Sequence, residues 1–104
     1  MSFFDTGESL EAFAFETLTV TNASKALTTA TYASPSTGAA ARRAYITTET
    51  DSVRMRADGT DPTASVGHLI AAGGQVWVTG SADLASVRFI RTNTDATLSV
   101  TYYR

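Results

Sequence analysis

The sequence of 104 residues has no cysteine, only two prolines and a single histidine. Without cysteine, the chain can form neither a disulfide framework nor a thiolate metal site. His68 alone cannot build a histidine metal cage, because such a cage needs several imidazoles. No serine stands in a Gly-x-Ser-x-Gly elbow, and only His68 is available as the base of a nucleophilic site. These absences predict a non-enzymatic protein without a cofactor.

Charge and long apolar runs are scarce as well. Charged residues make up 17% of the chain and the formal net charge is -2, so no positive field gathers nucleic acid or an anionic membrane. No segment approaches the roughly twenty apolar residues of a membrane span. The N-terminus lacks a basic region followed by a long apolar run. We therefore expect no nucleic-acid partner, no membrane partner and synthesis in the cytoplasm.

The residues that are present favour strands. Thr and Ala dominate the small residues, and apolar and polar side chains alternate in many short segments. In the segment 53–57, Val53, Met55 and Ala57 alternate with Arg54 and Arg56, which is typical of a half-buried strand. The expected strands cover residues 18–21, 25–28, 43–48, 53–57, 66–71, 75–79, 86–91 and 96–103.

About eight short strands and no helix predict an all-β fold with two antiparallel sheets packed as a sandwich. Several connections are too long for an up-and-down meander, so a jelly roll is the expected topology. An immunoglobulin-like sandwich is the rival topology, although its disulfide is missing. The strands at 43–48 and 53–57 are expected to form a hairpin. Residues 17–104 are expected to be one domain, preceded by residues 1–16 as a first strand or an arm.

The N-terminal segment is rich in apolar rings. Phe3, Phe4, Phe13 and Phe15 either cover the sheet of their own domain or pack on a neighbouring subunit, because a small domain has little room for four terminal rings. We predict these residues as interface candidates.

Arginine supplies nearly all the cations of the chain. Arginine suits bidentate pairs with carboxylates across an interface. Arg54 and Arg56 are therefore further interface candidates, on an outward strand face that either meets another subunit or is exposed to solvent.

The strand at 53–57 runs into a turn with two carboxylates. Asp58-Gly59 accepts a positive φ, and Pro62 cannot donate to a ladder, so the strand has to end there. The oxygens of Asp58, Thr60 and Asp61 offer calcium ligands, but their spacing is not that of a twelve-residue calcium loop. We expect a structural turn without a bound ion.

Aromatic side chains offer a second kind of site. Trp77, together with Tyr102 and Tyr103 and in a larger set with Tyr32 and Tyr45, is a candidate sugar-binding platform. Trp77 lies between Val76 and Val78, so alternation places it either in the core or on the other face of the sheet. Core packing, subunit contact and sugar binding all remain open at this point.

The last sixty residues carry a recognisable pattern. A strand leads into Asp-Gly-Thr-x-Pro-Thr at 58–63, and the chain closes with Ala-x-Leu-x-Val-x-Tyr-Tyr at 96–103. This pattern resembles the small β-sandwich structural proteins encoded among the virion genes of tailed bacteriophages. The resemblance implies a non-enzymatic virion component, of the capsid decoration or cement type or associated with the tail or a fibre.

A small sandwich with an apolar arm suits a protein that staples a lattice. We expect it to self-associate, with a homotrimer as the favoured assembly, and to bind the phage major capsid protein in the virion. The alternative is a glycan-binding module on a tail or fibre.

Overall fold

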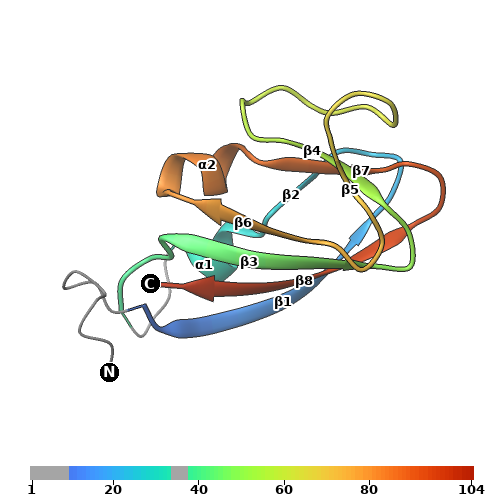
Figure 1. Ribbon diagram of the computed structural model, residues 1–104. Coiled ribbons are helices and arrows are strands. Elements are labelled where there is room, and N and C mark those ends of the chain that lie inside the picture. Colours follow the sequence, from blue (N-terminus) through green and yellow to red (C-terminus); the bar gives the residue numbers. More distant parts are fainter. Residues whose placement is uncertain (1–9, 34–37) are drawn as a thin grey trace.

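The computed structural model describes residues 10–33 and 38–104. Within them the chain forms two four-stranded sheets and two short helices. The strands are β1 (Ala12–Val20), β2 (Lys25–Ala26), β3 (Arg43–Glu49), β4 (Val53–Arg56), β5 (His68–Ile70), β6 (Gln75–Thr79), β7 (Arg88–Arg91) and β8 (Ala96–Tyr103). The helices are α1 (Thr29–Tyr32) and α2 (Ser81–Ser86). Sheet A has the strand order β1-β8-β3-β6 and sheet B has the order β2-β7-β4-β5. Figure 1 shows the two sheets as stacked layers.

The strand pairing is that of a jelly roll. Antiparallel ladders join β1 to β8, β2 to β7, β3 to β6 and β4 to β5, as if one long hairpin of eight strands were rolled up. The rolled pairs are then joined sideways by the β3–β8 and β4–β7 ladders. The expected all-β two-sheet sandwich with jelly-roll order is therefore confirmed.

The core lies between the sheets and follows from strict alternation. In β8, Ala96, Leu98, Val100 and Tyr102 are fully buried, while the residues between them are only half-buried. Phe89 closes the core from sheet B. Each fully buried large side chain of this kind contributes about 1.5–3 kcal/mol of hydrophobic free energy. Alternation thus fixes which face of each strand points outward.

The predicted hairpin between β3 and β4 is wrong. β3 belongs to sheet A and β4 to sheet B, so the connection at residues 50–52 crosses from one layer to the other. Thr50 has a φ of +78°, and the hydroxyl of Thr48 donates to the carbonyl oxygen of Asp51 at 3.2 Å. The short polar link between these strands therefore forms a corner between the two sheets. Sequence spacing alone does not distinguish such a corner from a hairpin.

The two helices were not predicted. Leu84 of α2 is 1% exposed and fills one end of the core. Tyr32 of α1 is also buried, and its hydroxyl lies 3.4 Å from the carbonyl oxygen of Leu84, so the two helices meet. Helices of four and six residues are too short to produce a helical period in the sequence.

β1 also differs from expectation in its length. It runs without interruption from Ala12 to Val20, across the expected boundary between residues 16 and 17. Its ladder with β8 has a shift between Ala12 and Ala14.

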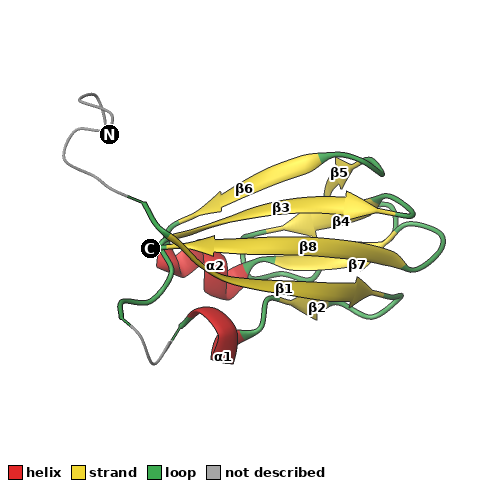
Figure 2. Ribbon diagram, turned by 90° about the horizontal axis from the view of Figure 1, so that it is seen from below, coloured by secondary structure: helices red, strands yellow, loops and turns green. Residues whose placement is uncertain are grey.

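The outer faces of the two sheets are covered differently. Over sheet B lies the loop 57–67, in which Pro62 is buried and the Oγ of Ser24 donates to Asp61 Oδ1 at 2.9 Å. Over the outer face of sheet A, no helix or loop of the described residues is drawn in Figure 2, where this sheet faces the viewer. Among the described residues, the outward side chains of sheet A are therefore not covered by another segment.

Candidate functional site

Aromatic rings gather on the outer face of sheet A. Tyr45 of β3 lies directly across from Trp77 of β6, with 4.9 Å between the ring centroids. The ring of Tyr103, from β8, reaches Trp77 from the other side at 5.4 Å. The guanidinium carbon of Arg43 lies 5.9 Å from the centre of the Trp77 ring, within the range of a cation–π contact. We call Arg43, Tyr45, Trp77 and Tyr103 the aromatic cluster.

The cluster is open to solvent. Trp77 is 48% exposed, which is high for the largest side chain of the chain. Its rings are tilted by 45° to both tyrosines, a favourable arrangement for aromatic pairs that also leaves part of the indole uncovered. The rings hold each other in place and still offer an apolar surface.

Polar groups surround the rings. The hydroxyl of Tyr45 donates to Oε1 of Gln75, which lies two residues before Trp77 on the same face. The strand registers place hydroxyl groups beside the cluster, at Thr47, Thr79, Ser99 and Thr101. Such a surface combines an apolar centre with hydrogen-bonding groups at its border.

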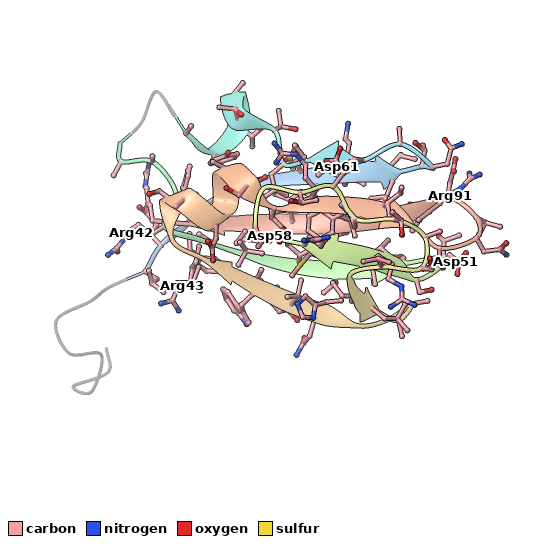
Figure 3. All side chains as sticks on the ribbon, turned by 90° about the horizontal axis from the view of Figure 1, so that it is seen from above. Arg42, Arg43, Asp51, Asp58, Asp61 and Arg91 are labelled. Atoms are coloured by element: carbon pink, nitrogen blue, oxygen red, sulfur yellow. The ribbon has the colours of Figure 1, made fainter. Side chains whose placement is uncertain are left out.

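A shallow hollow adjoins the cluster at the end of β6. It has a volume of about 350 Å³ and is lined by Arg42, Arg43, Thr79, Gly80 and Ser81. Arg43 and Thr79 face each other in the β3–β6 ladder, so the hollow continues the face that carries Trp77. Figure 3 shows Arg42 and Arg43 at this end of the sandwich.

Three arginines lie at this end among the described residues. Arg104 follows Tyr103, and its Nε donates to Glu11 Oε1 at 2.9 Å. Arg42 and Arg43 lie beside it, and the carboxylate of Asp83 belongs to α2, the helix whose Ser81 lines the hollow. Guanidinium groups and carboxylates therefore both occur around this end of the sandwich.

Two of the three predicted platform residues come together and one does not. Trp77 and Tyr103 lie in the aromatic cluster, so Trp77 occupies the outer face and not the core. Tyr102 is fully buried, and its hydroxyl donates to Glu16 Oε2. The prediction that Tyr102 belongs to a surface platform is therefore wrong. Adjacent strand residues point to opposite faces, and therefore Tyr102 and Tyr103 cannot share one. Burial, with the Glu16 carboxylate as second cause, raises the pKa of the Tyr102 phenol.

Neither the contact of Arg43 with Trp77 nor the hollow beside it was predicted from the sequence. The alternation in β3 places Arg43 and Tyr45 on one face, but only the strand order places that face beside Trp77. Tyr45 belongs to the larger set of aromatic candidates, but the sequence pattern did not show that it lies across from Trp77. The hollow depends on α2, which the sequence pattern did not indicate.

The predicted interface phenylalanines are placed in part. Phe15 is 61% exposed on β1, at an edge of sheet A. Phe13 is half-buried and packs partly against the core, with the Arg104 guanidinium 4.6 Å from its ring centre. Phe3 and Phe4 lie outside the described residues.

The two interface arginines of β4 have partners within the chain. Nη1 of Arg54 donates to the carbonyl oxygen of Gly67 at 3.1 Å, beneath the loop 57–67, so this part of the face meets its own loop. Nε of Arg56 donates to Asp58 Oδ1 at 3.1 Å. This pairing raises the pKa of Arg56 and lowers that of Asp58. Both arginines thus take part in holding the strand and the turn together.

The remaining polar candidates are spread apart. Asp58 accepts from Arg56 and from the backbone N–H of Thr60, whereas Asp61 accepts from Ser24. His68 is exposed on β5 and lines a hollow of about 270 Å³ with Arg56, Ala57 and Asp58. Across residues 10–33 and 38–104, no three His, Asp or Glu side chains are grouped so that they could hold a metal ion.

At the other end of the sandwich, Asp51 ties two loops together. Its carboxylate accepts from the backbone N–H and the hydroxyl of Thr94 and from the N–H of Ser52. These bonds lower the pKa of Asp51, and the Thr94 backbone bond is the largest cause. These hydrogen bonds between the two loops account for the position of the Asp51 carboxylate, and no ligand is needed to explain it.

Comparison with protein-family models, with curated proteins and with solved structures found no match for this chain. In the part of the chain that the structure describes, no helix has the length and apolar character needed to cross a membrane.

Proposed function

We propose that the protein is a non-enzymatic structural component of a tailed-phage virion that decorates or cements the capsid shell through subunit contacts. The likeness of residues 53–63 and 96–103 to small virion sandwiches supports this function. A decorating protein needs one side for attachment and another that tolerates solvent, and the different cover on sheets A and B agrees with that need.

The observation that carries the proposal is the exposure of Phe15. At 61% exposed it leaves more of its surface open than any other large hydrophobic residue of the described chain. It lies on β1, an edge strand of nine residues that contains neither lysine nor proline, the residues that usually protect an open edge. The β1 side of sheet A is therefore the proposed contact with the major capsid protein and with neighbouring copies of the chain.

Shell binding can be tested with two matched variants. Phe15→Ser removes the ring from the proposed contact, whereas Leu69→Ser removes an apolar side chain that is 55% exposed on β5 of the other sheet. Capsid shells are assembled without the protein, and each variant is added before calorimetry. We expect the wild type and Leu69→Ser to raise the melting temperature of the shell and Phe15→Ser to raise it much less.

Equal melting temperatures with and without the wild-type protein would reject the cement function. Native mass spectrometry of the free protein tests the self-association separately. A trimer is expected, and a monomer at every concentration would reject this part of the proposal.

Glycan recognition on a tail or fibre is a second candidate function, and the aromatic cluster is the observation that favours it. The cluster lies toward β6, while Phe15 lies on β1 at the other edge of sheet A. The two functions therefore use different parts of the face.

A further inference from the structure

We propose that the aromatic cluster and the adjoining hollow bind a carboxylated glycan, in which a sugar ring rests on Trp77 and an acidic group enters the hollow at Arg42 and Arg43. This inference rests on the glycan-binding candidate function and adds to it the chemical class of the ligand.

The apolar part of the site matches the face of a pyranose ring. A sugar presents C–H groups on its flat faces and hydroxyl groups around its edge. Trp77 offers an exposed indole surface held by Tyr45 and Tyr103, and the amide of Gln75 and the hydroxyl of Thr101 stand near it. A site with an apolar centre and few placed polar groups is the usual construction of a small-molecule site.

The polar surroundings favour a sugar over a protein partner. A stable protein interface buries about 800 Å² on each side and has an apolar centre. The outward positions next to the cluster carry hydroxyl groups, at Thr47, Thr79, Ser99 and Thr101, and the exposed ring of Phe15 lies at the other edge of the sheet. The three rings of the cluster therefore form a small apolar area with a polar border, which suits one sugar ring better than a protein partner.

The hollow determines the acidic class of the ligand. Its volume of about 350 Å³ suits a small group, and its lining combines two guanidinium groups with the hydroxyls of Thr79 and Ser81. Guanidinium groups bind carboxylates in a bidentate geometry, and they keep their charge at any physiological pH. Arg43 also contacts the Trp77 ring, so one residue links the sugar surface to the charged hollow. A sugar chain on the rings would thus bring its carboxylate to the arginines.

Binding can be followed by the fluorescence of Trp77, which is the only tryptophan in the chain. The probes are an oligogalacturonate and the same oligosaccharide after its carboxylates have been reduced to alcohols. We expect a saturable change in emission with both, about tenfold or more tighter for the acidic form, because charge-assisted hydrogen bonds are stronger than neutral ones. Added salt should lower the affinity for the acidic probe and leave the affinity for the reduced probe unchanged.

Variants separate the two parts of the site. Arg43→Gln should lower the affinity for the acidic probe about tenfold and leave that for the reduced probe unchanged. The matched control Arg91→Gln removes an arginine at the opposite end of the sandwich and should change neither affinity. Trp77→Thr, which suits a strand, should abolish binding of both probes in calorimetry.

Each outcome has a distinct meaning. Equal affinity for the two probes would overturn the acidic class while leaving glycan binding in place. No response to either probe would overturn both. A dimer or larger assembly that Trp77→Thr dissociates, without any sugar response, would identify the cluster as a protein contact and would also overturn the inference.

Discussion

Neighbouring residues of one strand lie on opposite faces of the sheet, as Tyr102 and Tyr103 show. Tyr103 joins the exposed aromatic cluster, while Tyr102 stacks on Tyr32 inside the sandwich with 5.4 Å between ring centroids. The sequence pattern of β8 contains this information, because Tyr102 shares its parity with Leu98 and Val100. What it could not reveal is the partner of the buried hydroxyl, Glu16, which lies on a strand eighty-six residues away in sequence.

Replacement of Tyr102 by phenylalanine should destabilise the protein by about 1.5–2 kcal/mol at neutral pH, because the hydrogen bond to the Glu16 carboxylate is lost. The free energy of unfolding in urea measures the effect. Tyr103→Phe is the matched control and should change the stability by less than about 0.5 kcal/mol, since this ring lies on the surface. If both variants lose the same stability, the buried hydrogen bond is not the cause.

The same pair predicts the response to alkali. Burial and the Glu16 carboxylate raise the folded-state pKa of Tyr102 above its ordinary value of about 10. The folded protein therefore keeps this proton where the unfolded chain has released it, so the stabilisation is complete below pH 10 and is lost as the pH rises further. The stability gap between the wild type and Tyr102→Phe should accordingly narrow above pH 10, and a constant gap would contradict the raised pKa.

At the scale of elements, the loop 57–67 gives sheet B its cover. The turn that begins at Asp58 was predicted to end β4, and β4 does end at Arg56. The sequence did not show that the loop then folds back over its own strand. That contact depends on Pro62 and Gly67 reaching Arg54, and close approach of backbone to side chain leaves no pattern in the residues themselves.

Gly67 is the residue that permits this close approach. Its φ is +134°, and a Cβ there would lie 3.1 Å from the carbonyl oxygen of Met55 and 3.2 Å from the Cβ atoms of Arg54 and Pro62. Gly67→Ala should therefore destabilise the protein by about 2–3 kcal/mol through backbone strain and crowding. Gly59→Ala is the control, with a φ of +86° but open space around it, and should cost only about 1 kcal/mol.

Thermal or urea unfolding of the two alanine variants measures the difference. If Gly67→Ala is no less stable than Gly59→Ala, the loop 57–67 does not pack on β4 and does not cover sheet B.

At the scale of the whole molecule, alternation sufficed for the strands but not for their arrangement. Short apolar–polar repeats placed the strands near their observed positions, and polar connections of varied length favoured the jelly roll over a meander. The sheet to which each strand belongs is set by packing across the core, and hence the β3–β4 connection was misread as a hairpin. For the same reason the sequence named Trp77 and Tyr103 as candidates but could not bring Arg43 and the hollow to them.

The jelly-roll order also predicts slow, cooperative folding. β1 and β8 lie at opposite ends of the described chain and pair along almost their whole length, so sheet A is complete only after the longest loop has closed. Loop-closure entropy of this kind slows folding, and all-β domains with such pairings fold in milliseconds to seconds. Stopped-flow refolding followed by Trp77 fluorescence should show this time range.

The same fold predicts a single equilibrium unfolding transition, because both sheets share one core. The unfolding curve measured by Trp77 fluorescence should therefore coincide with the curve measured by far-ultraviolet circular dichroism. Microsecond refolding, or two separate transitions, would mean that the sheets form independently of the β1–β8 ladder.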